Sequence, residues 1–272
     1  MRGRANIANN KWVIAALAGM LYYPSMAQQP IFDIAPQTSA QKADSASYLQ
    51  SYFYNGVGLL KRPLHWDKEN WFVASGTLVF SFSVLALDDA LNETIRGWDN
   101  RFARQFGRTG DALGSLPAQF GLSAGALAFG AMAKHPPLIH FGLDNLQAQT
   151  FTTGLVVVIK HLTHRSRPFT GNGPFKWYGP FSGWEHDSFV SGHAALAFST
   201  AHMTFLHSGK KWWVGVLSYG AATAIGASRM QQQKHWATDV VLGAVLGSAV
   251  SNYVYNQQQK RRQVRQGLKP LP

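Results

Sequence analysis

Six long stretches with very few charged residues follow one another from residue 71 onward, and they constrain the fold more than any other feature. They cover residues 71–87, 112–133, 140–159, 193–208, 212–228 and 239–255. A helix that crosses a bilayer needs roughly 20 residues, with a range of ~17–25. The pattern therefore predicts an all-α helical bundle with about six transmembrane or core helices. A soluble bundle with buried helices is the alternative that the pattern leaves open.

Small residues are common in these stretches, and two glycine pairs stand one helical turn apart. Gly121 and Gly125 form the first pair, and Gly243 and Gly247 form the second. Small residues at this spacing let two helix backbones approach closely. Both pairs are therefore predicted to lie at helix–helix contacts. Trp212-Trp213 and the pair Tyr253 and Tyr255 are predicted to lie at the membrane interface, where aromatic residues gather.

Two segments outside the long stretches have apolar residues at helical spacing. The first begins at Ser45 and is ended by Lys61-Arg62-Pro63. The second is marked by Leu91, Ile95, Trp98 and Phe102. Both are predicted to be amphipathic helices suited to a membrane surface. Because the stretch 71–87 is at the short end of the range for a span and lies between them, we expect it to be the one that does not cross.

The two ends of the chain carry basic residues. Residues 1–27 combine a basic start with an apolar run and a small-residue ending, as in a secretory signal peptide or an uncleaved N-terminal anchor. Residues 28–70 are predicted to be a flexible lead followed by the first amphipathic helix, residues 71–255 the main helical domain, and residues 256–272 a basic tail. Since Lys and Arg are enriched in cytoplasmic segments, the tail is expected in the cytoplasm.

Composition narrows the classes of function. The chain has 25 Lys and Arg against 13 Asp and Glu, a net charge of +12, which indicates an anionic partner. Cysteine is absent, which excludes thiol catalysis, iron–sulfur clusters and Cys-ligated zinc. Nucleic acid is not the expected partner, because no aromatic residues alternate with the basic ones in the tail. A phosphorylated substrate or a phospholipid surface fits better.

Three polar clusters lie at the ends of the apolar stretches in the second half of the chain. They comprise Lys160, Arg167 and Pro168; then Ser191, Gly192 and His193; then Ser228, Arg229, His235 and Asp239. The two guanidinium groups and the lysine provide positive charge for phosphate oxygens. The Ser191-Gly192 turn precedes a helix, whose N-terminus favours anions. A carboxylate four residues after His235 would share a helical face with it and hold the imidazole in one tautomer.

These clusters resemble the three-part signature of the type 2 phosphatidic acid phosphatase superfamily. The family pattern is Lys, six residues, Arg-Pro; Pro-Ser-Gly-His; and Ser-Arg, five residues, His, three residues, Asp. The sequence departs from it only at Val190, where the family usually has proline. The resemblance implies that His235 attacks phosphorus, Asp239 orients it and His193 protonates the leaving oxygen. It also implies phosphate binding by Lys160, Arg167, Ser191, Gly192 and Arg229, with no metal and no cofactor.

The family includes three kinds of protein, and we expect the first. It is a membrane phosphatase that hydrolyses a lipid phosphomonoester or diphosphate through a phosphohistidine, with its active site facing the periplasm or exterior. A soluble periplasmic acid phosphatase of broad specificity is the alternative, and a vanadium haloperoxidase is a remote one. Which lipid is hydrolysed and the oligomeric state stay open. Polar residues beside the motifs are expected to line the entrance rather than bind metal; these are His161, His164, Glu185, His186 and Asp187.

Overall fold

The computed structural model describes residues 48–180, 182 and 187–266, and within these ranges all the regular structure is helical. The eight α-helices are α3 (Tyr48–Lys61), α4 (Lys68–Arg96), α5 (Arg101–Gly114), α6 (Leu116–Met132), α7 (Pro136–Thr163), α8 (Gly192–His207), α9 (Trp212–Gln231) and α10 (Ala237–Arg265). The predicted all-α bundle is confirmed. The predicted signal peptide or anchor, residues 1–27, and the lead up to residue 47 lie outside the described residues.

Each of the six apolar stretches forms most of one helix, and the first amphipathic helix corresponds to α3, which ends at Lys61. The separate amphipathic helix predicted from Leu91 to Phe102 is wrong. Leu91 and Ile95 belong to the last turns of α4, whereas Phe102 lies in the first turn of α5. Asn100 makes the break, because its side chain accepts a hydrogen bond from the backbone N–H of Ala103 and caps α5.

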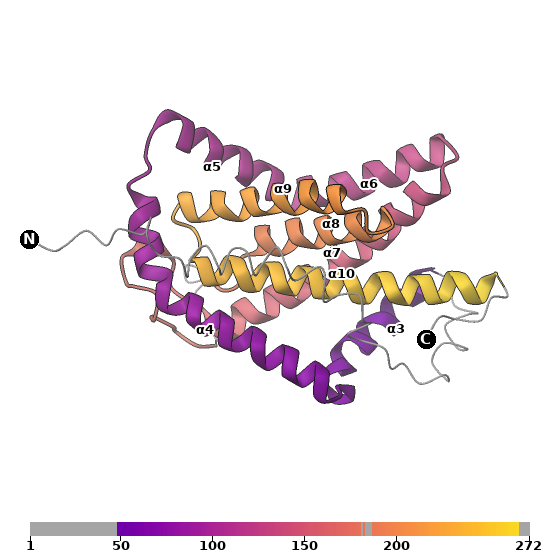
Figure 1. Ribbon diagram of the computed structural model, residues 1–272, viewed down its shortest axis with the longest axis horizontal. Coiled ribbons are helices and arrows are strands. Elements are labelled where there is room, and N and C mark those ends of the chain that lie inside the picture. Colours follow the sequence, from indigo (N-terminus) through magenta and orange to yellow (C-terminus); the bar gives the residue numbers. More distant parts are fainter. Residues whose placement is uncertain (1–47, 181, 183–186, 267–272) are drawn as a thin grey trace, which may run out of the picture.

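Helix α8 lies in the middle of the bundle, where it packs against α7, α9 and α10 (Figure 1). Helix α6 packs on α7, α5 packs on α9, and α4 runs obliquely along α10. One buried cluster lies between α7, α8 and α10; it contains Ala148, Met203, Val250, Tyr253 and Val254. Tyr253 was expected at the membrane interface, but its side chain is part of this core, and Tyr255 packs against the same cluster.

The two glycine pairs behave differently. A methyl group added at Gly247 would lie 1.9 Å from the carbonyl oxygen of Ala195, and one at Gly243 would lie 2.6 Å from that of Ser191. These two glycines therefore allow α10 to touch α8, as predicted. Around Gly121 and Gly125 no atom lies within 4 Å of such a methyl group, so the predicted close contact at this pair is wrong. Their face of α6 points away from the neighbouring helices.

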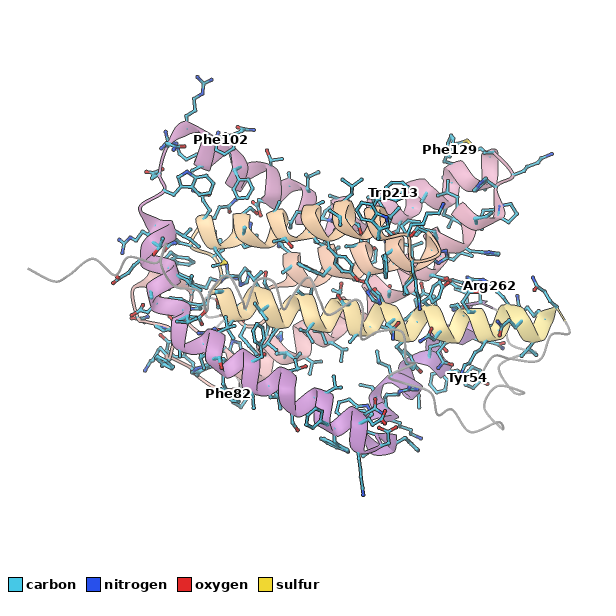
Figure 2. All side chains as sticks on the ribbon, viewed as in Figure 1. Tyr54, Phe82, Phe102, Phe129, Trp213 and Arg262 are labelled. Atoms are coloured by element: carbon cyan, nitrogen blue, oxygen red, sulfur yellow. The ribbon has the colours of Figure 1, made fainter. Side chains whose placement is uncertain are left out.

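Within the described part of the chain, two helices, α4 and α10, are long and apolar enough to cross a membrane, and the bent pair of α5 and α6 could provide a third crossing. The expectation that 71–87 fails to cross rested on its shortness. That reason is wrong, because the helix continues on both sides and reaches 29 residues. Large apolar side chains project from the outer surface of the bundle, among them Phe82 on α4, Phe129 on α6 and Trp213 on α9 (Figure 2). Such a surface suits contact with lipid.

Candidate active site

The residues of the three motifs meet at one end of the bundle. Helices α7 and α9 run toward this end and α8 and α10 run away from it, at the left of Figure 1. Lys160 lies in the last turn of α7, and Ser191 caps the start of α8. Arg229 lies in the last turn of α9, and Asp239 lies in the first turn of α10. The alternation of helix direction therefore brings together motifs that are separated in sequence.

His235 lies in the loop before α10 and is almost fully buried. Its Nδ1 atom is 2.7 Å from the backbone carbonyl oxygen of Ser188, which fixes Nδ1 as the protonated nitrogen. Nε2 then keeps its lone pair. Burial, opposed by Asp239 and assisted by the charge of Lys160, lowers the pKa of His235 to about 3. The imidazole is therefore neutral, as a nucleophile must be.

Asp239 was expected to hold His235 directly through a shared helical face. His235 precedes the helix, and the distance from its Nδ1 to Oδ2 of Asp239 is 3.8 Å, longer than the distance to the Ser188 carbonyl. The carboxylate of Asp239 instead accepts hydrogen bonds from the Ser188 hydroxyl at 2.5 Å and from the Trp236 backbone N–H at 2.8 Å. Asp239 therefore holds the two residues that surround His235.

The three predicted phosphate-binding cations carry donors that point into this end of the bundle. Lys160 donates to the backbone carbonyl of Asp187, and Arg167 lies 3.4 Å from the same oxygen. Burial lowers the pKa values of Arg167 and Arg229, and the two guanidinium groups repel each other. The Nε–H groups of both arginines are buried and have no hydrogen-bond partner among the described residues. Buried donors without partners are costly, and a phosphate oxygen would satisfy them.

His193 stands in the first turn of α8 beside a residue that the sequence did not point to. Its Nε2 lies 3.1 Å from Oδ1 of Asp111 on α5, and Arg229 donates a hydrogen bond to the same carboxylate. Burial and the charge of Arg229 lower the pKa of His193 to about 4, while Asp111 acts in the opposite direction. Asp111 is half exposed. The His193 side of the site is therefore the more open one.

The sequence contained one unused signal for this contribution of α5. Gly107, Gly110 and Gly114 recur along one side of the helix, and all three are buried. A methyl group at Gly110 would lie 2.0 Å from the Ser228 hydroxyl, and one at Gly114 would lie 3.0 Å from the ring of His193. The glycines thus bring α5 against two of the motifs. Their spacing could have predicted a helix packed on the site.

Of the polar residues beside the motifs, His164 and Asp187 contact each other, whereas Nδ1 of His161 lies 2.8 Å from the carbonyl oxygen of Val157 on its own helix. His164 is buried, and its Nδ1 lies 2.9 Å from a carboxylate oxygen of Asp187. Glu185 and His186 lie outside the described residues. Within residues 48–180, 182 and 187–266 no group of three or more His, Cys, Asp or Glu side chains is arranged to hold a metal ion. The His164–Asp187 pair anchors the segment whose carbonyl groups contact Lys160 and His235.

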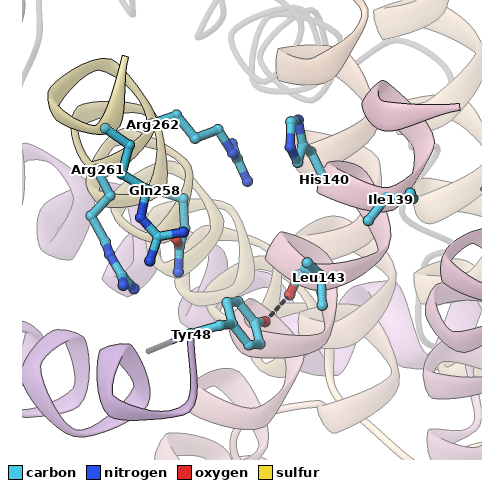
Figure 3. Close-up of a pocket in the computed structure, with 8 residues that line it drawn as sticks. Tyr48, Ile139, His140, Leu143, Gln258, Arg261 and Arg262 are labelled. Atoms are coloured by element: carbon cyan, nitrogen blue, oxygen red, sulfur yellow. Dashed lines mark hydrogen bonds between the residues drawn. The ribbon is translucent and has the colours of Figure 1, made fainter. Parts of the chain in front are cut away.

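A cavity of about 200 Å³ lies far from the motifs, where α10 ends and α7 begins (Figure 3). Arg261, Arg262, Gln258 and His140 line it together with Tyr48, whose hydroxyl donates to the Leu143 carbonyl. None of its lining residues belongs to the three motifs. This cavity is therefore separate from the candidate active site.

Comparison with known proteins gave one family and three relatives. The family model described as the PAP2 superfamily matches residues 143–263. A lipid A 1-phosphatase of Porphyromonas gingivalis is 39% identical over 70 residues, which is 25% of this chain and 16% of the length of that relative. LpxE of Aquifex aeolicus is 24% identical with a TM-score of 0.48, over 62% of this chain and 94% of that one.

The third relative is a transmembrane PAP2 type phosphatidylglycerolphosphate phosphatase from Bacillus subtilis. It is 21% identical, with a TM-score of 0.54, over 68% of this chain and 96% of that one. This likeness shows a shared fold. The matched family region contains all three motifs, the end of α7 that carries Lys160, the helices α8 and α9, and most of α10.

Proposed function

Because residues 143–263 belong to the PAP2 superfamily, we propose that the chain is a metal-independent phosphatase acting on a lipid phosphomonoester or diphosphate. One observation carries the proposal most directly. A neutral buried imidazole with a free Nε2 stands among the motif cations, where two guanidinium groups have buried Nε–H donors that lack partners among the described residues. Such a site combines a nucleophile with a cradle for the oxygens of a phosphoryl group.

The proposed reaction has two steps. In the first, Nε2 of His235 forms a bond to phosphorus while the bond to the leaving oxygen breaks, and protonated His193 gives its proton to that oxygen. In the second, His193 takes a proton from water, the water oxygen attacks phosphorus, and the phosphohistidine bond breaks to release inorganic phosphate. Lys160, Arg167 and Arg229 stabilise the charge on the transferring group in both steps. Ser191 and the backbone N–H of Gly192 complete the cradle at the start of α8.

Two observations support a lipid as the substrate. Helices α4 and α10 are suited to a membrane, and apolar side chains cover the outside of the bundle. Two relatives are named for phosphatases of lipid A and phosphatidylglycerolphosphate. The basic residues at the end of α10 favour a cytoplasmic C-terminus. Since α10 begins at the site, this orientation supports the proposal that the site faces the periplasm or exterior.

Phosphate release from the purified protein in detergent micelles tests the proposal. The substrate panel contains phosphatidate, phosphatidylglycerol phosphate, undecaprenyl diphosphate and lipid A, with p-nitrophenyl phosphate as the water-soluble ester. We expect faster hydrolysis of at least one lipid; a clear preference for the soluble ester would favour the broad-specificity acid phosphatase instead. Excess EDTA should leave the rate unchanged, and vanadate should inhibit as a transition-state mimic. Loss of activity in EDTA that Mg²⁺ restores would contradict the metal-independent mechanism.

Alanine variants of His235 and His193 should differ in whether they form the covalent intermediate. His235→Ala should abolish the covalent intermediate, whereas His193→Ala should still form it from substrates with good leaving groups, which need little protonation. Labelled substrate, rapid quenching without acid and peptide mapping locate the phosphoryl group. Label on His193 would reverse the assignment.

A further inference from the structure

Three fully buried charged side chains lie directly behind the candidate nucleophile. Arg165 comes from the segment after α7, Asp88 from α4, and Asp239 from α10; the side chain of each has no exposed surface. Nη1 of Arg165 is 2.6 Å from Asp239, and Nη2 is 2.7 Å from Asp88. One guanidinium group thus joins a carboxylate of the candidate site to a carboxylate of α4, a helix long and apolar enough to cross a membrane.

The guanidinium group of Arg165 is held on every side. Its Nε donates to the carbonyl of Pro174 at 2.9 Å, and its Cζ atom lies 5.0 Å and 5.5 Å from the ring centres of Trp177 and Trp236. Five N–H donors in a rigid plane can bind two carboxylates in fixed directions, which a lysine cannot do. Arg165 therefore orients the carboxylate of Asp239 and also balances its negative charge.

Asp88 attaches the same arginine to the start of α10. Its Oδ1 accepts the backbone N–H of Thr238 at 2.9 Å, and its Oδ2 accepts the Thr238 hydroxyl at 2.8 Å. These bonds satisfy an N–H group in the first turn of α10, where a negative charge is favourable. Asp88 therefore fixes the first turn of α10, the turn that carries Asp239.

The chain of contacts ends on His235. Asp239 holds the Ser188 hydroxyl, and the Ser188 carbonyl accepts the proton of His235 Nδ1. The backbone N–H of Ser188 also donates to the carbonyl of Arg165 at 3.0 Å. A shift of Arg165 would thus move Ser188 through two independent connections. The imidazole would lose the acceptor that selects its tautomer.

We infer that Asp88 and Arg165 are positioning residues that hold His235 with Nδ1 protonated and Nε2 directed at the substrate. The inference rests on the proposed function. A buried ion pair by itself says little about stability or activity. This ion pair is different because hydrogen bonds connect it to the Ser188 carbonyl, which binds Nδ1 of His235. That connection gives the ion pair a role in the reaction. Helix α4, whose outer side chains are suited to lipid, is thereby connected to the candidate nucleophile.

Kinetics of the full-length protein in detergent provide the first test. Asp88→Asn removes one charge without changing shape, and Arg165→Lys keeps the charge but cannot reach both carboxylates. Loss of a residue that orients a metal-bound histidine typically costs roughly 10–100-fold in activity, and we use the same range for a residue that orients a nucleophilic histidine. We expect kcat per folded molecule to fall by that factor in both variants, with KM within about twofold of the wild type, because the phosphate-binding cations are untouched.

Asp144→Asn is the matched control. Asp144 is also fully buried and bound to an arginine, 2.5 Å from Arg262, but at the other end of the bundle. It should lower the unfolding temperature without changing kcat per folded molecule. Thr238→Val, which removes one hydrogen bond to Asp88 and no charge, is the milder variant if the others fail to fold. For it we expect a several-fold loss of kcat.

The tautomer of His235 gives a readout that does not depend on activity. In protein labelled with ¹⁵N-histidine, the His235 signals are identified by their absence in His235→Ala. We expect a single Nδ1-protonated form in the wild type and in Asp144→Asn. A mixture with the Nε2-protonated form is expected in Asp88→Asn, Arg165→Lys and Thr238→Val. An unchanged tautomer together with wild-type kcat in these three variants would overturn the inference, as would a loss of activity that only follows the loss of folded protein.

Different results would contradict the proposed function and the positioning role of Asp88 and Arg165. A wild-type protein that hydrolyses none of the lipid phosphates contradicts the proposed function. The tautomer comparison would still decide whether Asp88 and Arg165 position His235.

Discussion

Two buried clusters, one at each end of the bundle, combine an aspartate, an arginine and a histidine. At the candidate site these are Asp239, Arg165 and His235; at the far end they are Asp144, Arg262 and His207. Both aspartates are fully buried, and both arginines lie within hydrogen-bond distance of them. Along α7 the 16 residues from Asp144 to Lys160 separate the two ends by about 24 Å. The composition of the two clusters is the same.

The clusters differ in which imidazole nitrogen is engaged. In the far cluster, Nε2 of His207 lies 3.0 Å from the carboxylate of Asp144. In the candidate site the carboxylate lies 3.8 Å from Nδ1 of His235, and a backbone carbonyl holds this nitrogen instead. Nε2 of His235 is thus left for attack on a substrate. Burial of charge is common to both ends, whereas an imidazole held by a backbone carbonyl rather than by the carboxylate distinguishes the site.

The strongest test of this contrast removes each histidine. His235→Ala should lower kcat by at least ~10⁴-fold, because loss of a nucleophile removes the covalent route. His207→Ala should retain the wild-type kcat per folded molecule. Both variants are measured by phosphate release, normalised to folded protein from gel filtration. Comparable losses in the two variants would show that the imidazoles act through stability.

A second test replaces an arginine at each end. Arg229→Lys should lower kcat/KM by ~10²–10³-fold, the usual cost of removing one preorganised contact to the transition state. The charge is retained, but a point charge does not replace a planar fork. Arg262→Lys serves as the control and should leave kcat/KM unchanged. Near-normal kinetics in Arg229→Lys would mean that this arginine does not bind the phosphoryl group.

A third test uses pH. The general acid His193 must be protonated, and the negative charge of Asp111 raises its pKa against the lowering caused by burial and Arg229. Asp111→Asn removes that charge, so the pKa of His193 falls further. The alkaline limb of the kcat profile should move to lower pH by about 0.5–1 unit, a modest shift because Asp111 is half exposed. Asp144→Asn should leave the limb in place. A shift toward higher pH in Asp111→Asn would exclude His193 as the group that titrates.

The smallest effect on activity is expected at the far end. Asp144 accepts a hydrogen bond from the guanidinium group of Arg262 and lies against Nε2 of His207, and a hydrogen bond to a charged group contributes about 1.5–3 kcal/mol. Asp144→Asn should therefore lower the free energy of unfolding by about 1–3 kcal/mol, since an amide keeps part of the interaction. Chemical denaturation in detergent measures this, with Asp99→Asn, at an exposed ion pair, as the control. Equal stability of the two variants would contradict a structural role for Asp144.

Much of the fold could be predicted from the sequence, because helix formation depends on neighbours in the chain. Apolar stretches of bilayer length predicted α4 and the helices from α6 to α10, and Lys61-Arg62-Pro63 marked the end of α3. The break between α4 and α5 was missed, because the apolar spacing from Leu91 to Phe102 continues across the capping residue Asn100. Spacing alone does not say which helical face is covered. Gly247 touches α8 while Gly121 touches nothing, although both belong to the same kind of pair.

The residues of the candidate site also fall into two groups, those that the sequence predicted and those that it did not. Motif spacing pointed to Lys160, His193, Arg229 and His235, since each motif is local and the helix directions bring all of them to one end. Their roles in the reaction stay predictions. No local pattern marked Asp88, Asp111 or Arg165. Asp88 is 77 residues from its arginine, Asp239 is 74 residues from it, and Asp111 is 118 residues from Arg229.

The sequence by itself determined the helices and the chemical groups available at their ends. The tertiary structure alone decided which carboxylate meets which cation and which nitrogen of His235 is held. The reason is physical: a buried charge is stable only beside a partner, and that partner is provided by whichever helix packs there rather than by a neighbour in the chain.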